Sequence, residues 1–267
     1  MARVTTKPWH AITIAAAGHL HGLFVCRPDP APPNRADPAH RATMKPSTQL
    51  PNLWIAIGIL LALFALQMVI GAALYDLLGE IRPGDPVATG IVMILSYAII
   101  FALLLKRVGL GFADIFHQSS SSVRSVLLVL GLPILLVVVG ANWWFADLAW
   151  LLVPQQYVND YEHEMLLRLV NGGLASLVIV GVVGPVIEEI MFRGILLRGF
   201  LQHYTEQRAL LLSAGLFAVY HLTFAQLPVA FVGGLFTGWL YIRSRSLWPC
   251  VVAHIGYNTS AVVIVVQ

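Results

Sequence analysis

Long runs of apolar residues, separated by short polar breaks, fill the chain from Leu53 to its end. A helix needs about 20 apolar residues to cross the hydrocarbon core of a bilayer, because each residue advances it by about 1.5 Å. The runs that reach or approach this length are Leu53–Tyr75, Val87–Leu105, Ser125–Leu148, Leu174–Leu197, Ala209–Leu222, Ala225–Ile242 and Leu247–Val266. We expect the short fifth run to begin nearer Tyr204. The pattern predicts an all-α fold, a polytopic bundle of about seven transmembrane helices.

The composition agrees with a membrane location. Charged residues make up 11% of the chain and hydrophobic residues 58%, whereas a soluble domain carries about a quarter charged residues. The basic residues form no dense block of the kind that binds nucleic acid. The two cysteines, Cys26 and Cys250, are too few for a disulfide framework or a thiolate metal site. We therefore expect the lipid bilayer, and no nucleic acid, as a partner.

Residues 1–50 differ from the rest of the chain. The stretch from Arg27 to Arg35 is proline-rich and polar, so it cannot pack as a helix or a sheet. The weakly apolar segment before it resembles a poor signal-peptide core. A second interpretation is that translation starts at Met44, just ahead of the first strong apolar run. With either start, the predicted division is a poorly structured tail over 1–50, accessory transmembrane helices over 51–170 and a core with polar motifs over 171–267.

Lysine and arginine gather on one side of the predicted topology. If the N-terminus is cytoplasmic, the basic residues on the inner side are Lys106, Arg107, Arg124, Arg193, Arg198, Arg208, Arg243 and Arg245. The outer loops hold only Arg82 and Arg168, together with the acids Asp76, Glu80, Asp85, Asp160, Glu162 and Glu164. Cytoplasmic loops are normally the positive ones. The sequence therefore predicts a cytoplasmic N-terminus.

Two adjacent carboxylates, Glu188 and Glu189, stand within the fourth apolar run. Ionisable groups inside a membrane span are costly and usually mark a functional site. Arg193 follows Glu189 by four residues, acid first, which is the favourable orientation for an intrahelical ion pair. Glu188 lies about 100° further round the helix. We therefore expect Glu189 to be structural and Glu188 to be free to act as a base, although acids near the interface, neutralised by arginine, would show the same pattern.

Two later runs each carry a histidine. Phe217 and His221 are four residues apart in the fifth run, and His254 and Asn258 are four apart in the seventh. Residues at this spacing share one helix face. A lone histidine in an apolar helix is more often a satisfied core residue than a catalytic one, but two such motifs favour a shared site. Counting residues from the helix ends brings both histidines and Glu188 to overlapping depths in the bilayer.

Small residues Gly233, Gly234 and Gly238 stand in the run between the two histidine motifs. Glycines at this spacing let neighbouring helix backbones approach closely. We expect them to pack the helices that carry the polar motifs.

The ordered set of Glu188-Glu189-x-x-x-Arg193, Phe217-x-x-x-His221 and His254-x-x-x-Asn258 resembles the CPBP family, the CAAX-protease and bacteriocin-processing group. This family includes the type II CAAX prenyl endopeptidases and the Abi-like proteins. The resemblance covers the chain from about Leu174 to Val266, which would then be the catalytic core. It implies an integral membrane endopeptidase, in the cytoplasmic membrane, with a cavity open to the cytosol and a peptide or protein substrate that can be membrane-anchored.

The resemblance also implies roles for the motif residues. Glu188 and His221 would position and deprotonate a water molecule, while His254 and Asn258 would stabilise the oxyanion. Glu189 and Arg193, with Phe217, would support the site. A carboxylate shielded from bulk water is a stronger base, and preorganised donors stabilise a developing charge.

The sequence leaves three questions open. Glu188, His221 and His254 could hold Zn²⁺ with an open fourth position, although we favour chemistry without a metal. A catalytically idle scaffold or immunity protein of the same family, or a small transporter, would also retain buried ionisable groups. Nothing in the sequence names the substrate or shows whether it is prenylated.

Overall fold

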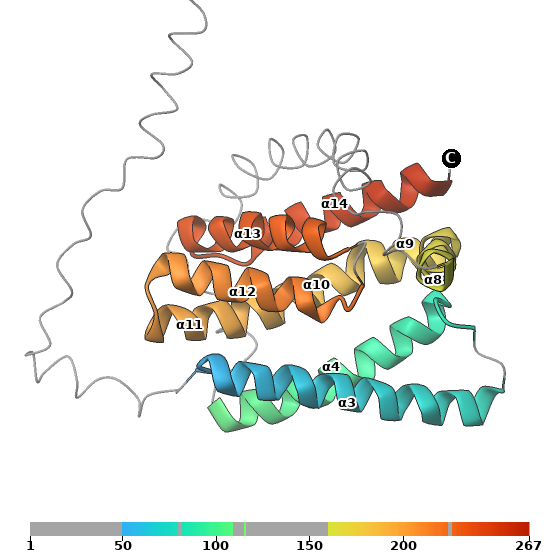
Figure 1. Ribbon diagram of the computed structural model, residues 1–267, viewed down its shortest axis with the longest axis horizontal. Coiled ribbons are helices and arrows are strands. Elements are labelled where there is room, and N and C mark those ends of the chain that lie inside the picture. Colours follow the sequence, from blue (N-terminus) through green and yellow to red (C-terminus); the bar gives the residue numbers. More distant parts are fainter. Residues whose placement is uncertain (1–49, 80–81, 109–114, 116–159, 224–225, 267) are drawn as a thin grey trace, which may run out of the picture. The chain divides into compact units, whose positions relative to one another are not determined.

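The computed structural model describes residues 50–79, 82–108, 115, 160–223 and 226–266. Every regular element in these ranges is a helix, so the predicted all-α fold is confirmed for this part of the chain (Figure 1). The predicted third span, Ser125–Leu148, lies outside the described residues, as does the predicted tail apart from Leu50. The count of about seven spans and the predicted domain boundaries stay predictions.

The described helices follow the predicted runs closely. In chain order they are α3 (Leu53–Leu78), α4 (Pro86–Val108), α8 (Asp160–Asn171), α9 (Leu174–Val178), η3 (Ile179–Val183), α10 (Gly184–Glu189), η4 (Ile190–Leu197), α11 (Arg198–His203), α12 (Glu206–Tyr220), α13 (Leu227–Ser244) and α14 (Trp248–Val266). The fifth run does begin earlier than its apolar part, at Glu206. The short helix α8 was not predicted, because charged residues interrupt its apolar residues too often for an apolar run.

Three described helical stretches are long and apolar enough to cross a membrane, namely Leu53–Leu78, Pro86–Arg107 and Leu174–His203. Much of their apolar surface is exposed: Leu61 and Met68 of α3 are 64% and 61% exposed. Large exposed apolar faces of this kind are stable against lipid tails and costly in water. The protein is an integral membrane protein built as a helical bundle.

The helices run in alternating directions, so the bundle has two ends. At one end Pro51, just before α3, packs against Gly199 of α11, and Glu206 at the start of α12 pairs with Arg245 after α13 at 3.7 Å. We call this the basic end, because Lys106 and Arg107 close α4 there as well. The start of α3, the end of α4, the α11–α12 connection and the α13–α14 connection all lie at this end.

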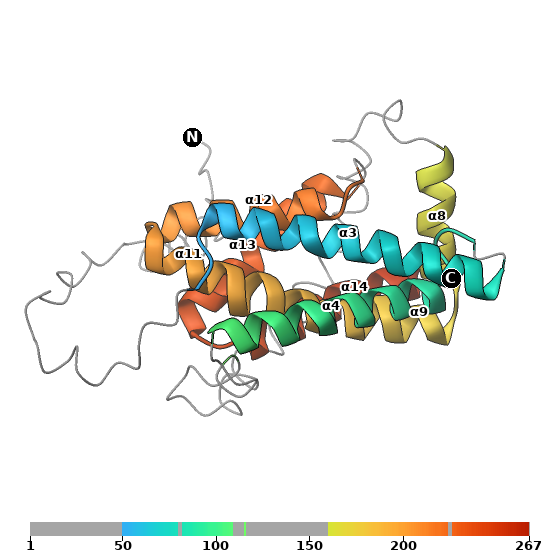
Figure 2. The same ribbon diagram turned by 90° about the horizontal axis from the view of Figure 1, so that it is seen from below.

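The opposite end carries helix α8, and we call it the α8 end. Gly84, in the connection from α3 to α4, lies against the backbone of Met165 in α8. Gly172, which follows α8, lies against Pro86 at the start of α4. In Figures 1 and 2, α8 runs across the direction of the other helices. The α3–α4 connection, α8 and the start of α9 therefore meet at the same end.

Helices α12 and α13 form a hairpin whose backbones lie close together at two glycines. A Cβ atom on Gly234 would meet the Cα of Ala214 at 3.1 Å and the Phe217 ring at 3.3 Å. A Cβ on Gly238 would meet the side chain of Leu210. The predicted close packing is confirmed for these two glycines but not for Gly233, whose Cβ position has no neighbour within 4 Å.

Gly234→Ala is expected to be less stable than Gly233→Ala by about 1–3 kcal/mol, because overpacking a tight contact costs about that much. Both changes remove the same backbone freedom from neighbouring positions of one helix. Gly233→Ala is therefore the matched control, and it should not lower stability. Thermal unfolding in detergent measures the difference, and equal unfolding temperatures would contradict the tight α12–α13 contact.

Candidate active site

The glutamate pair lies on one continuous helical stretch, Leu174–His203, that is not a regular α-helix. Pro185 has no N–H group, and its ring would clash with the carbonyl four residues earlier. The turn before it is a π-helix, η3, in which the Gly184 N–H donates to the carbonyl of Ile179. A second π-helical segment, η4, follows Glu189. Such widened turns often occur at functional sites, and the apolar pattern of the sequence did not predict them.

Arg193 joins three elements of the bundle. Its Nε lies 3.2 Å from Glu189 Oε2, and neither side chain is exposed, so the ion pair predicted from their spacing is present. Its Nη2 donates to the carbonyl of Gly234 in α13 at 3.1 Å. Its guanidinium carbon lies 4.5 Å from the centre of the Phe217 ring in α12, within the range of a cation–π contact. The cation therefore fixes η4 against both helices of the hairpin.

His254, from α14, lies between the two glutamates. Its Nδ1–H donates to Glu189 Oε1 at 2.9 Å, and its Nε2 lies 3.7 Å from Glu188 Oε2. The second distance is too long for a direct hydrogen bond. The sequence did not predict the bond to Glu189, because 65 residues separate the two partners. Glu189 thus contacts both Arg193 and His254. The Glu188 carboxylate makes no direct hydrogen bond to His254.

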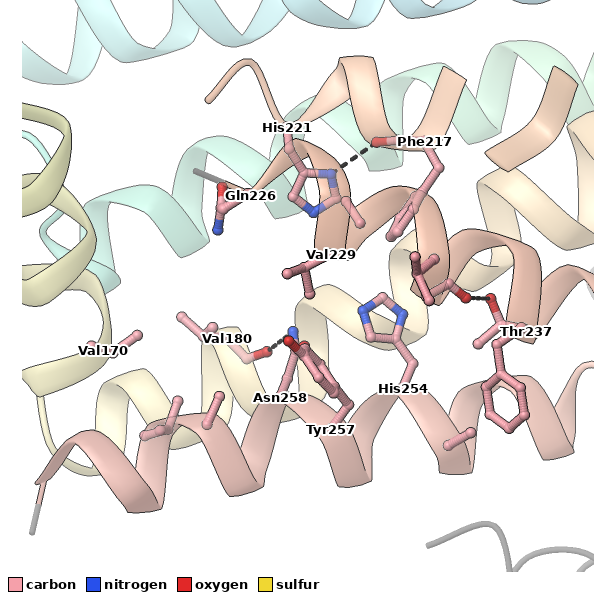
Figure 3. Close-up of a pocket in the computed structure, with 17 residues that line it drawn as sticks. Val170, Val180, Phe217, His221, Gln226, Val229, Thr237, His254, Tyr257 and Asn258 are labelled. Carbon is pink, nitrogen blue, oxygen red and sulfur yellow. Dashed lines mark hydrogen bonds between the residues drawn. The ribbon is translucent and has the colours of Figure 1, made fainter. Parts of the chain in front are cut away.

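His221 ends helix α12. Its ring N–H at Nδ1 donates to the carbonyl of Phe217 at 2.8 Å, which leaves Nε2 facing the pocket (Figure 3). The Phe217 ring lies 4.7 Å from the His221 ring and 5.7 Å from the His254 ring, centre to centre. The prediction that Phe217 and His221 share one stripe of the helix is confirmed, and the phenyl ring contacts both imidazoles.

A cavity of about 430 Å³ lies beside these rings. Its polar lining comes from His221, His254 and Asn258, as expected, and also from Gln226, Thr237 and Tyr257, while the rest of its wall is apolar. Figure 3 shows His221 and His254 on two sides of this space, with Asn258 further along α14. The predicted face shared by His254 and Asn258 is therefore present and lines the pocket.

The amide of Asn258 is turned toward the backbone. Its Nδ2 donates to the carbonyl of Val180 in η3 at 2.9 Å, and close packing of Thr259 on Gly181 holds α14 against the same segment. A carboxamide NH₂ group carries two donor hydrogens, so one remains for another acceptor. The spacing of residues in the sequence did not predict this contact.

Glu188 is not among the residues that line the pocket. Its side chain is 16% exposed and reaches the pocket wall through His254. In the part of the chain that the structure describes, no three histidine, cysteine, aspartate or glutamate side chains are grouped closely enough to hold a metal ion. The three donors considered for Zn²⁺ are Glu188, His221 and His254, and they are not grouped in this way among the described residues.

Polar residues that the sequence analysis missed surround the site. Gln226 lines the pocket, and its Oε1 accepts from the Thr223 hydroxyl at 2.8 Å. Next to His221, the Tyr220 hydroxyl accepts from Gln67 of α3 at 2.7 Å, and the Tyr97 ring packs edge-on against Tyr220. Isolated glutamines inside apolar runs were the available signal, since a polar side chain at membrane depth needs a partner.

Comparison with known proteins points to one family. Residues 170–260 match the family model described as "Type II CAAX prenyl endopeptidase Rce1-like", and this range contains all three motifs. The chain is 26% identical over 100 residues to "Putative membrane peptidase YdiL" of Bacillus subtilis (strain 168), an alignment that covers 38% of this chain and 41% of that protein. No solved structure matches the chain.

The two matches agree with each other and with the motif order. The family description names an endopeptidase, and the relative is named as a putative membrane peptidase. His221 and His254 of the family pattern both contact the Phe217 ring, and both glutamates lie next to His254. The match over residues 170–260 therefore supports the resemblance to the CPBP family that the three motifs predicted.

Proposed function

We propose that the chain is an intramembrane endopeptidase that hydrolyses peptide bonds of membrane-associated proteins or small peptides. One observation carries the proposal: the carboxylate of Glu188 lies 3.7 Å from His254 at the wall of a largely apolar pocket that His221 and Asn258 also line. Burying these ionisable groups in a membrane bundle is costly, and such groups are retained for function.

In the proposed reaction Glu188 takes a proton from a water molecule while the water oxygen attacks the carbonyl carbon of the scissile bond. His221 orients this water through Nε2, and the second Nδ2 hydrogen of Asn258 donates to the oxyanion that forms. Because His254 Nδ1–H already donates to Glu189, His254 can donate to the oxyanion only from Nε2 and only as an imidazolium. Glu188 then gives the proton to the leaving amine as the C–N bond breaks. Since Glu188 does not line the pocket, its side chain must turn toward it when substrate binds.

Glu189 and Arg193 have a supporting role in this proposal. The buried Glu189 carboxylate accepts from His254 Nδ1 and faces Arg193 Nε. This arrangement keeps the His254 ring oriented with Nε2 toward Glu188. A fixed ring orientation matters because general acid–base chemistry depends on the geometry of the donor.

Cleavage of a randomised pool of internally quenched decapeptides by purified protein in proteoliposomes tests the proposal. Products should form with the wild-type chain and be absent with the Glu188→Ala variant, which should remain folded like the wild type. Mass spectrometry of the products would identify the bond. No products with either protein would contradict the proposal and favour an idle scaffold, an immunity protein or a small transporter.

We propose that the reaction needs no metal cofactor. The described donors Glu188, His221 and His254 are not grouped as a metal site, and the carboxylate alone suffices as the base. Peptide cleavage should therefore survive exhaustive treatment with EDTA and 1,10-phenanthroline. A loss of activity that Zn²⁺ restores would contradict this prediction, and a parallel assay of a known zinc peptidase provides the control.

We further propose the cytoplasmic membrane as the location, with the N-terminus inside. The basic end of the bundle supports this orientation, because lysine and arginine are retained on the cytoplasmic side. The substrate is a peptide or protein that reaches the pocket from the membrane or its surface.

A further inference from the structure

Helix α4 packs along the helical stretch Leu174–His203, and both run in the same direction (Figure 2). A Cβ atom on Gly90 would meet the side chain of Ile179, and a Cβ atom on Gly184 would meet that of Met93 at 3.9 Å. The second contact lies further along both helices than the first. The two helices are therefore parallel, and their contacts keep step along the interface.

One turn beyond the second contact stand Tyr97 on α4 and Glu188 on the stretch. Tyr97 follows Met93, and Glu188 follows Gly184, by four residues, which keeps each on the same helix face as its predecessor. The two side chains therefore extend toward the same interface, and they interact electrostatically. No residue of α4 lines the pocket. This placement explains why Glu188 does not line the pocket either.

Tyr220, at the end of α12, closes this interface from a third helix. Its ring lies 5.6 Å from that of Phe192, the residue one turn after Glu188, and 6.3 Å edge-on from that of Tyr97. Its hydroxyl accepts from Gln67 of α3 at 2.7 Å. Tyr220 also interacts electrostatically with Glu188. Three helices thus supply polar side chains to the neighbourhood of one carboxylate.

The Tyr97 hydroxyl needs an acceptor. Tyr97 is 1% exposed, and its hydroxyl oxygen has no hydrogen-bond partner among the described residues. A buried hydroxyl without a partner is destabilising. The hydroxyls of Tyr97 and Tyr220 lie near each other, and the carboxylate with which both interact is that of Glu188. Oε2 of this carboxylate faces His254 at 3.7 Å, which leaves Oε1 for a donor on the other side.

We propose that the Tyr97 hydroxyl donates to Oε1 of Glu188, directly or through one water molecule, and that Tyr97 is a positioning residue for this base. The positioning role rests on the proposed function, and the hydrogen bond itself does not. With Oε1 held, the turn that Glu188 makes in the reaction carries Oε2 toward the pocket about a fixed point. Alignment of a reacting group in this way contributes strongly to the rate.

A thermal unfolding cycle in detergent tests the hydrogen bond without any assay of cleavage. Tyr97→Phe removes only the hydroxyl and should lower the unfolding temperature of the wild-type chain by about 3–10 °C, because hydrogen bonds to charged groups are among the stronger ones. In a Glu188→Ala background the same change should lower it no further, since the acceptor is gone. An equal loss in both backgrounds, or no loss in the wild-type chain, would overturn the proposal.

Tyr75→Phe is the matched control. It makes the same chemical change at a tyrosine of α3 that is 55% exposed. The unfolding temperature and the kcat for peptide cleavage should both stay at the wild-type values.

Peptide cleavage tests the positioning role. Tyr97→Phe should lower kcat about tenfold at unchanged KM, because Tyr97 does not line the pocket and acts only through Glu188. An unchanged kcat, or a loss confined to KM, would overturn the role. If the wild-type chain cleaves no peptide, the proposed function fails, and the unfolding cycle still decides whether Tyr97 binds Glu188.

Discussion

Glu188→Gln is expected to lower kcat for peptide cleavage by about 10²–10⁴-fold, the usual contribution of a general base. The amide has nearly the same shape but cannot accept a proton from water. Among the described side chains, the closest basic group to the Glu188 carboxylate is the His254 ring, at 3.7 Å. The unfolding temperature should therefore change little, and the effect should fall on kcat rather than KM.

Two matched variants make this result specific. Glu189→Gln removes the neighbouring carboxylate and leaves Arg193 buried without its ion pair, so it should lower stability as well as activity. Glu164→Gln removes an acid whose ion pair with Arg168 lies at the surface and should change neither. If Glu188→Gln retains cleavage within about tenfold of the wild-type rate, Glu188 is not the base, because proton transfer alone should supply more than this.

Arg193→Met is expected to lower the free energy of unfolding by about 3–5 kcal/mol, the cost of leaving one partner of a buried ion pair uncompensated. Both Arg193 and Glu189 have 0% side-chain exposure. The change also removes the bond to the Gly234 carbonyl and the contact with Phe217. Arg168→Met provides the control, because its pair with Glu164 is exposed and such pairs contribute at most about 1 kcal/mol.

The double variant Glu189→Gln with Arg193→Met separates stability from function. Removing both charges should recover much of the lost stability, since well-packed neutral residues can replace a buried pair at little cost. Cleavage should stay low, because His254 loses the carboxylate that orients its ring. Thermal unfolding and peptide cleavage measure the two effects. Full recovery of activity in the double variant would show that the pair serves packing alone.

Relationships within a single helix could be predicted from the sequence. Four-residue spacing correctly gave the Glu189–Arg193 pair and the Phe217–His221 stripe. It also gave the face that His254 and Asn258 present to the pocket. The helical geometry fixes which residues share a face whatever the rest of the fold does. The local motifs therefore sufficed to name the family.

Relationships between helices were decided by packing. Spacing could not show that His254 bonds to Glu189, that Asn258 bonds to Val180, or that Glu188 lies behind the pocket wall. Each depends on the rotation and register of α14 against a helix widened by π turns. Pro185 causes the first of these turns, but its effect on neighbouring helices follows only from the assembled bundle.

The sequence by itself determined that the chain is a helical membrane protein and which of its ends is basic, because apolar length and charge distribution act along the chain. Only the tertiary structure decided where the pocket lies between those ends. Its position follows from helices α8, α13 and α14 meeting around His254, and residues that meet across a bundle are set by side-chain packing rather than by their spacing in the sequence.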